Sequence, residues 1–151
     1  MSNSTYTIID FKNYLEQICN DFNSYRKDGV VNVNKKLIEL GRTLGDFPDI
    51  WKIKNNQVIG CTSNVFINTS VANRKIFYIG YSDSEIVKGQ LALLINGLNM
   101  LTPQEIVNQT ESHLTDFVKN SDVRFSMSIS RANSLGTLYQ FMKKKAEDYL
   151  I

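Results

Sequence analysis

The sequence predicts an α+β fold in which N-terminal, central and C-terminal helices flank a small antiparallel sheet built on one hairpin. Three observations predict it: apolar residues recur at helical spacing in the first part of the chain, the period becomes extended in the middle, and helical spacing then returns. The chain has 151 residues, of which 42% are apolar and 21% are charged. This composition is typical of a globular protein, and the length suits a single domain over residues 1–151.

Two amphipathic helices are predicted before the sheet. The first covers residues 8–22, with apolar side chains at Ile8, Phe11, Leu15, Ile18 and Phe22. The second has the same spacing at Val30, Val33, Leu37, Leu40 and Leu44. Because glycine favours the ends of helices, the second helix should end among Gly41 and Gly45, and Pro48 marks the loop after it.

The middle of the chain is predicted to form a β-hairpin. Residues 64–71 and 75–81 are rich in branched and aromatic side chains, which favour strands. The residues between them, 72–74, are few enough for a hairpin turn. Trp51, the single tryptophan, is expected to be an anchor beneath the loop that leads into the first strand.

A central buried helix should follow the hairpin. Ser82 and Glu85 have the spacing of a capping box, which predicts the start of this helix. The residues after them, 86–98, are apolar on more than one face, as is typical of a helix buried on several sides. We therefore expect this helix to form the centre of the core.

Two shorter helices are predicted next along the chain. Thr102 and Glu105 form a second capping box, and Pro103 occupies the first helical position, where proline is favoured. This short helix should run through Val107. A further helix is expected over residues 111–119, so that the hairpin is followed by helices only.

The last predicted helix begins near Ser130 and packs one apolar face on the core. Its apolar positions are Leu135, Leu138, Tyr139, Met142 and Ala146. A basic cluster, Lys143, Lys144 and Lys145, falls in the last turns of this helix, where cations complement the helix dipole. Since the net charge is only +2, we expect no nucleic-acid partner.

The start of the chain and the lack of a long apolar stretch indicate a cytoplasmic protein. The first residues, M-S-N-S-T-Y-T, are polar and lack the apolar core of a signal peptide. No apolar stretch reaches the length of a membrane span, so we expect no membrane partner. Cys19, Cys61 and the single histidine, His113, cannot form a zinc or iron-sulfur site without carboxylates from elsewhere, and in the cytosol both thiols are expected to be free rather than joined in a disulfide.

Cys61 has the setting of a reactive thiol. It follows Gly60 and precedes Thr62 and Ser63, on a loop just before the first strand. Glycine leaves room for another molecule to approach, and backbone N–H groups and hydroxyls favour the thiolate. The alternative is an inert core cysteine at the start of a strand. Cys19, on a helix flank without such neighbours, is expected to be structural.

Five short blocks follow one another along the chain with a characteristic spacing. They read L-I-E-L-G-R at 37–42, V-I-G-C-T-S-N-V at 58–65, Y-S-D-S-E-I-V-K-G at 81–89, L-T-P-Q-E-I at 101–106 and S-R-A-N at 130–133. In this order they resemble the blocks of the SufE family, over about residues 35–142. The joint spacing makes the resemblance specific, since any one block alone would be weak.

The resemblance implies that the protein carries sulfur. SufE proteins are sulfur-transfer partners of cysteine desulfurases in iron-sulfur cluster assembly, and the family's persulfide-forming cysteine falls on Cys61. The implied partners are a SufS-like desulfurase and a SufBCD-like scaffold. No cofactor of its own is implied, because pyridoxal phosphate belongs to the desulfurase. The residues assigned to partner binding are Gly60, Thr62, Ser63, Asp83 and Arg131.

The chain departs from the family pattern at several positions. Phe66 stands where the family usually has a tryptophan, which keeps an aromatic ring. Ser126 and Ile129 stand where histidine and proline are common, and Ser134 replaces a common glycine. These changes leave the cysteine block intact, but they bear on which desulfurase is recognised and on how the last helix begins.

Two other functions use the same residues. A thiol hydrolase would have Cys61 as its nucleophile and His113 as its base, although His113 also suits a plain polar helix face. A docking protein would modulate a partner enzyme with a dispensable cysteine. Within the sulfur-carrier hypothesis, the apolar Val58 and Ile59 suggest that the cysteine loop is buried at rest and swings out on docking.

Overall fold

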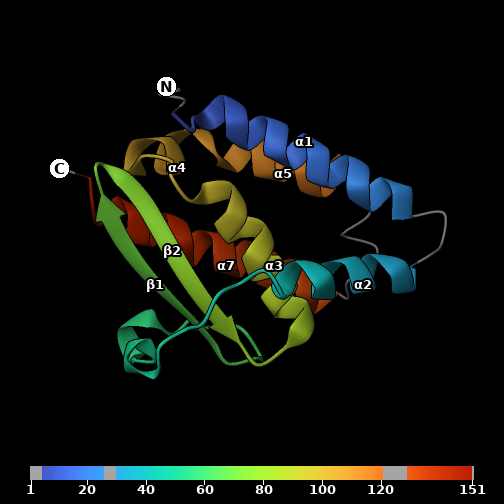
Figure 1. Cartoon of the computed structure of the whole chain (residues 1–151), viewed down its shortest axis with the longest axis horizontal. Helices are drawn as coiled ribbons and strands as arrows, with labels where there is room; N and C mark the ends of the chain where they lie inside the picture. The colour runs from blue at the N-terminus through green and yellow to red at the C-terminus, as the bar shows by residue number, and fades with distance from the viewer. Residues whose placement is uncertain (1–4, 26–29, 121–128, 151) are drawn as a thin grey trace.

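The computed structural model describes residues 5–25, 30–120 and 129–150 (Figure 1). Within these residues, α-helices pack against one two-stranded antiparallel sheet, so the predicted α+β class is confirmed. The elements are α1 (Ile8–Tyr25), α2 (Val30–Gly41), β1 (Val65–Ala72), β2 (Lys75–Ser82), α3 (Glu85–Leu98), α4 (Pro103–Gln109), α5 (Glu111–Asn120) and α7 (Ile129–Glu147).

The helices lie on one face of the hairpin. β2 packs on α3, and β1 packs on α7, while α1 lies against α3 and α5. In Figure 1 the hairpin therefore forms one side of the molecule and α1 with α5 forms another, with α3 and α7 between them. No helix in the described part of the chain is long and apolar enough to span a membrane.

The hairpin has the predicted place and a two-residue turn. The strands pair from Val65 opposite Ser82 to Ala72 opposite Lys75. Asn73 and Arg74, which make the turn, both have positive φ angles, of 52° and 67°. Such turns match the twist of the two strands, and asparagine tolerates this backbone conformation better than most residues. Both strands end one residue later than the sequence pattern indicates.

The central helix α3 is buried as predicted, but it begins differently. Its N-cap is Ser84, whose hydroxyl accepts a hydrogen bond from the backbone N–H of Val87 at 3.3 Å. The predicted capping box of Ser82 and Glu85 is therefore wrong. Ser82 still belongs to β2, and its hydroxyl accepts from the N–H of Ser84 at 3.1 Å, so the chain turns before the helix starts.

The close crossing of α2 and α3 depends on Gly89. A Cβ atom at this position would collide with the backbone carbonyl of Leu37 on α2. Only glycine lets the two helix backbones come this near. The helix pattern predicted as far as Leu44 stops at Gly41, the first of the two glycines proposed as its end.

The later helices confirm most of the predicted boundaries. The Thr102 capping box is complete, since Thr102 Oγ1 accepts from the N–H of Glu105 while the Glu105 carboxylate accepts from the N–H of Thr102. On α7 the predicted apolar stripe is buried: its members are Leu135, Leu138, Tyr139, Met142 and Ala146. This helix therefore packs one face on the core.

The segment before β1 corrects one expectation. Two short 3-10 turns, Asp49–Trp51 and Lys54–Asn56, lead toward the strand. Trp51 is 40% exposed and is therefore not the predicted anchor beneath the loop. The anchoring polar contact comes instead from Asn56, which is buried and donates to the carbonyl of Trp51 at 2.9 Å and to Asn68 Oδ1 at 3.1 Å.

Candidate functional site

The loop of residues 59–64 carries Cys61, and its two ends are held together at the start of β1. The N–H of Val58 donates to the carbonyl of Val65 at 2.9 Å, and Gln57 forms an isolated bridge with Phe66. Through these contacts, residues 57 and 58 pair with the start of β1. The residues between them are left outside the ladder, at the end of the sheet away from the hairpin turn.

Gly60 gives the loop its shape directly before the cysteine. Its φ angle is +99°, a conformation that residues with a side chain rarely adopt. The hypothesis that Val58 and Ile59 bury the loop at rest holds for only one of the two. Val58 is in the core, whereas Ile59 is 76% exposed and points an apolar side chain outward.

Asp83 fixes the other end of the loop. Its carboxylate accepts hydrogen bonds from the backbone N–H of Asn64 at 3.0 Å and from Asn64 Nδ2 at 3.2 Å. The N–H of Asp83 in turn donates to the carbonyl of Asn64 at 3.3 Å. Because α3 begins only at Glu85, Asp83 is no part of the helix, and its contacts within the chain are those of a clamp on the cysteine loop.

Cys61 is partly buried, and it packs against the edge of the hydrophobic core. Burial raises the pKa of the Cys61 thiol, while a hydrogen bond from the Ser134 side chain acts in the opposite direction. The expectation that the loop would favour the thiolate is therefore wrong, because the net effect of the surroundings is to raise the pKa of Cys61. The loss of contact with water therefore outweighs the hydrogen bond in its effect on the pKa of this thiol.

The loop lies against α7. A Cβ atom added to Gly60 would be 3.5 Å from Cγ2 of Thr137, which is ordinary van der Waals contact. A shallow hollow follows this seam between loop and helix. Its lining residues include Gln57, Ile59, Gly60, Thr137, Phe141 and Lys144.

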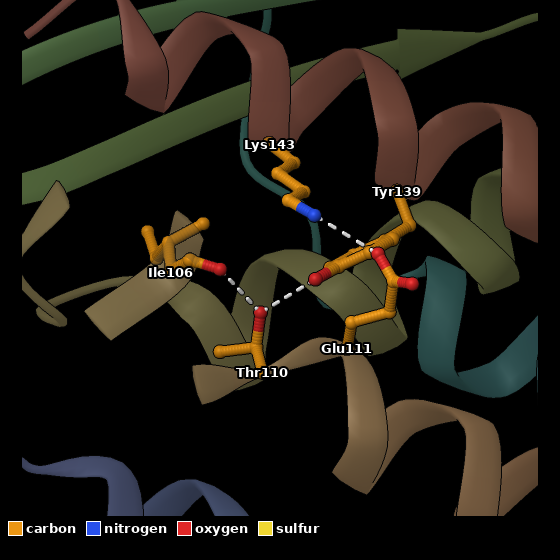
Figure 2. A network of polar contacts seen from close by, with 5 residues as sticks. All are labelled: Ile106, Thr110, Glu111, Tyr139 and Lys143. Carbon is orange, nitrogen blue, oxygen red and sulfur yellow. Dashed lines mark hydrogen bonds and ion pairs between the residues drawn. The ribbon is translucent and has the colours of Figure 1, made fainter. Parts of the chain in front are cut away.

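A set of polar contacts holds α7 in this position (Figure 2). The hydroxyls of Thr110 and Tyr139 lie 2.7 Å apart, and the Thr110 hydroxyl is also 2.7 Å from the carbonyl oxygen of Ile106, to which it donates. At the surface, Lys143 Nζ is 2.9 Å from Glu111 Oε1. Both contacts tie α7 to the α4–α5 corner, so the helix that faces the cysteine loop has a fixed place.

His113 lies in a different part of the molecule from Cys61. Its ring packs edge-on against Phe11 of α1, with ring centroids 6.5 Å apart. It lines a hollow between α1 and α5 together with Cys19 and Asp116. The two residues of the hydrolase hypothesis therefore belong to separate sites, one at the α1–α5 seam and one beside α7.

The remaining predicted site residues take different places. Thr62 is exposed and Ser63 is partly exposed, both on the cysteine loop. Arg131 belongs to α7, but its side chain lies outside the described residues, as does Ser126. Within the described part of the chain, no group of three histidine, cysteine or carboxylate side chains could hold a metal ion.

Ser134 is the contact of Cys61 that the sequence did not reveal. It was noticeable only as a serine where glycine is common, and nothing in that pattern pairs it with a cysteine more than seventy residues earlier. An aromatic group beside the base of the loop was also missed. Phe47, Phe66 and Tyr81 have their ring centroids 6.3 to 6.5 Å apart, and Lys52 Nζ lies 4.0 Å from the centroid of Tyr81.

The fold and the site together define a small α+β protein with one thiol on a clamped loop. The family described as SufE: Fe-S metabolism associated domain matches residues 16–146. The chain belongs to this family.

Curated relatives agree with this assignment, and a solved structure has a similar fold. A SufE-like protein of Synechocystis sp. is 39% identical over 112 residues, which are 74% of this chain and 68% of the relative. The sulfur acceptor protein CsdE of Escherichia coli is 32% identical over 105 residues, 69% of either chain. A hypothetical protein of Thermus thermophilus, known from a solution structure, has a TM-score of 0.70 at 17% identity, covering 89% of this chain and 94% of that one. The last similarity is one of fold alone.

Proposed function

We propose that this protein accepts persulfide sulfur from a cysteine desulfurase onto Cys61, stimulates that desulfurase and passes the sulfur to an iron-sulfur cluster scaffold. The observation that carries the proposal is the placement of Cys61. Its thiol is on a loop outside the sheet ladder, between Gly60 with its positive φ and the Asp83 clamp. The membership of the SufE family supplies the class of partner.

The chemistry is thiol–persulfide exchange. The Cys61 thiolate attacks the outer sulfur of a persulfide on the desulfurase, a bond forms between these two sulfurs, and the desulfurase cysteine leaves as a thiolate. No electrons are gained or lost overall, and the proton of the Cys61 thiol passes to solvent. The same exchange in the next step moves the outer sulfur to a thiol of the scaffold. Neither step requires a cofactor on this chain, because pyridoxal phosphate is the cofactor of the desulfurase.

Partial burial of Cys61 suits a carrier. A thiol with a raised pKa reacts slowly with stray oxidants and electrophiles, since the thiolate is the reactive form. Docking of a partner that loosens the seam between loop and α7 would expose the sulfur and restore its reactivity. Arg131, at the start of α7, and Asp83, at the base of the loop, are the residues that we assign to this encounter, with Gly60, Thr62 and Ser63.

A cytoplasmic location is part of the same proposal. Fractionation of cells that produce the protein, followed by immunoblotting, tests the location directly. Recovery with a membrane or organelle fraction would contradict it.

Desulfurase turnover separates the carrier from a docking-only protein. Formation of alanine from free cysteine should rise when the wild-type protein is added to a SufS-like desulfurase, and Cys19→Ser should stimulate equally. Cys61→Ser should lose the stimulation, because the persulfide on the desulfurase then has no acceptor. Equal stimulation by wild type and Cys61→Ser would show that docking alone is sufficient and would overturn the carrier role.

The hydrolase alternative has less support. His113 is at the α1–α5 seam, in a hollow that it shares with Cys19. A His113→Ala variant should accept sulfur and stimulate the desulfurase like the wild type. A hydrolytic activity of the isolated protein that disappears in His113→Ala would restore the hydrolase hypothesis.

A further inference from the structure

Gly136 lies in the interior of α7, where glycine is destabilising relative to alanine because it loses more backbone freedom on folding. On α3 the packing explains such a residue, since a Cβ atom at Gly89 would collide with the backbone of Leu37. At Gly136, within the described part of the chain, nothing lies within 4 Å of an added Cβ atom. Its φ angle is also not positive, unlike that of Gly60. Neither backbone conformation nor contact with the described residues therefore requires a glycine at this position.

The open space at Gly136 is part of the hollow between the cysteine loop and α7. Ile59 and Gly60 line this hollow from the loop, and Gly136, Phe141 and Lys144 are among the residues that line it from the helix. Since Gly60 directly precedes the cysteine, a molecule that fills the space contacts both the loop and the helix beside the sulfur site.

The hollow combines apolar side chains with a cation. Ile59 is 76% exposed, and Phe141 is partly buried and packs against the core. Lys144 is exposed and takes part in no ion pair among the described residues, whereas Lys143 is paired with Glu111. The described residues that line the hollow include no carboxylate. A complementary molecule therefore presents an apolar surface to Ile59 and Phe141 and a carboxylate to Lys144.

We propose that this hollow is the docking site for an acidic and partly apolar segment of the cysteine desulfurase, and that Gly136 keeps open the space that the segment fills. The proposal rests on the sulfur-acceptor function of Cys61, and it names the surface and the chemistry that bind the sulfur donor. Apolar contact at the centre with polar groups at the rim is the usual composition of a protein interface. A cation at the rim also speeds association with a partner of opposite charge.

The order of the two transfers favours the desulfurase over the scaffold as the occupant. The sulfur donor meets the protein before Cys61 carries sulfur, which is the state that the structure describes, with the loop against α7 at Gly60 and Thr137. The scaffold meets the protein only after the loop has accepted sulfur. A segment that binds across the seam in the unloaded state therefore belongs to the donor.

Two other hollows provide matched controls. The hollow between α1 and α5 is lined by Lys12 but also by Glu16 and Asp116, so its charges are of both signs. A hollow between α5 and α7 also reaches Gly136, and Thr115 lines it from α5. Variants at Lys12 and Thr115 therefore change charge and bulk at places that the proposed docking does not involve.

The first test fills the space at Gly136. Isothermal titration calorimetry measures the dissociation constant of a SufS-like desulfurase for the wild type, Gly136→Ala, Gly136→Leu and the control Thr115→Leu. Gly136→Leu should weaken binding by about tenfold or more, because its side chain occupies the hollow, and Gly136→Ala should weaken it less. Thr115→Leu should bind as the wild type does.

Thermal unfolding of the same variants separates docking from folding. Replacing Gly136 by alanine or leucine should raise the unfolding midpoint by about 2 to 4 °C, because both residues favour helices. A variant that is more stable than the wild type and yet binds the desulfurase more weakly has lost docking and not its fold. This combination is the result expected of a space that is kept open for a partner.

The second test reverses the charge at the rim. Lys144→Glu should weaken binding by about five- to tenfold at low ionic strength, and added salt should reduce this difference because it screens an exposed charge. The matched control Lys12→Glu changes the net charge equally and should bind as the wild type does. At saturating concentration, Lys144→Glu should still stimulate the desulfurase to the wild-type maximum, because Cys61 is unchanged.

Two results would overturn the proposal. If Gly136→Leu and Lys144→Glu bind the desulfurase as tightly as the wild type, the hollow is not its docking site. If they bind it normally but slow the transfer of sulfur to a SufBCD-like scaffold, the occupant is the scaffold. Failure of the carrier function gives a different result, in which the variants bind the desulfurase more weakly than the wild type but Cys61 of the wild type gains no sulfur. Absence of binding by the wild type would contradict both proposals.

Discussion

The two cysteines of this protein are both partly buried thiols, yet their surroundings differ. Cys19 is in the middle of α1, where its Sγ lies 3.5 Å from the carbonyl oxygen of Asn120 and 3.6 Å from Nδ2 of Asn23. Cys61 is on a loop between a glycine with positive φ and a carboxylate clamp. A helix backbone fixes the first sulfur, whereas the second is fixed only by contacts that a partner can displace.

The comparison teaches that exposure alone does not distinguish a carrier thiol from a structural one. What differs is the free energy needed to move the sulfur. Moving Cys19 would require breaking backbone hydrogen bonds of α1, while moving Cys61 requires the loss of its packing at the edge of the core and of the loop contact with α7. Variants at the two sites test this difference, and the largest effect is expected on sulfur delivery.

Delivery of sulfur should depend on one cysteine only. In cluster assembly on a SufBCD-like scaffold, with desulfurase and free cysteine as the source, Cys61→Ser should reduce the assembly rate to that of the desulfurase alone. Cys19→Ser should match the wild type, because its sulfur is not part of the loop. The rate is measured from the absorbance of the growing cluster. An equal loss of assembly rate in both variants would show that the two cysteines do not differ in sulfur delivery.

Gly60→Ala should destabilise the protein and disturb the loop. A residue with a side chain at φ +99° costs about 1 to 3 kcal/mol of unfolding free energy. The matched control is Gly45→Ala, since a Cβ atom at Gly45 would meet nothing within 4 Å and its φ is not in the strained region. Urea unfolding of both variants measures the difference. An unchanged midpoint for Gly60→Ala would show that the loop relaxes freely.

The pH profile of Cys61 alkylation should have its midpoint above the pKa of an ordinary thiol, because burial raises the pKa of Cys61. The sign for stability follows from the same shift. The folded protein holds the proton more tightly than the unfolded chain, so this contribution is present below the pKa of the unfolded thiol and is lost as the pH rises through the folded one. Rates of iodoacetamide labelling from neutral to alkaline pH, in Cys19→Ser, measure the midpoint. A midpoint below the ordinary value would show that the loop favours the thiolate after all.

Asp83→Ala should have the smallest effect on stability and a visible effect on the loop. The clamp is an exposed contact with Asn64, so its loss should cost at most about 1 kcal/mol. Cys61 should then be alkylated faster in the isolated protein, because one end of the loop is released. Asp116→Ala, which changes a carboxylate in the Cys19 hollow, should leave this rate unchanged. Equal rates in all three proteins would assign Asp83 to the partner encounter alone.

Local sequence signals predicted the fold well. The hairpin, the buried α3, the Thr102 capping box and the stripe on α7 each depend on residues that are near one another in the chain, so their patterns are readable there. The errors occurred where tertiary contacts decide. Ser84 displaced Ser82 as the cap because β2 continues through Ser82, and Trp51 is exposed whereas Asn56 makes the contact to β1.

The candidate site was only partly predictable. Gly60 before Cys61 indicated a loop thiol, and the family blocks selected Asp83. The net direction of the Cys61 pKa was missed, because it depends on how closely the loop packs against α7. The Ser134 contact was missed for the same reason, since it joins two segments far apart in the chain.

The most direct test of the account is the intact mass of the protein after incubation with a cysteine desulfurase and free cysteine. Wild type and Cys19→Ser should each gain one sulfur atom that a reductant removes, and Cys61→Ser should gain none. Peptide mapping should place the added sulfur on Cys61. A gain that persists in Cys61→Ser, or no gain in the wild type with a SufS-like desulfurase that it stimulates, would contradict the central claim that Cys61 carries the sulfur.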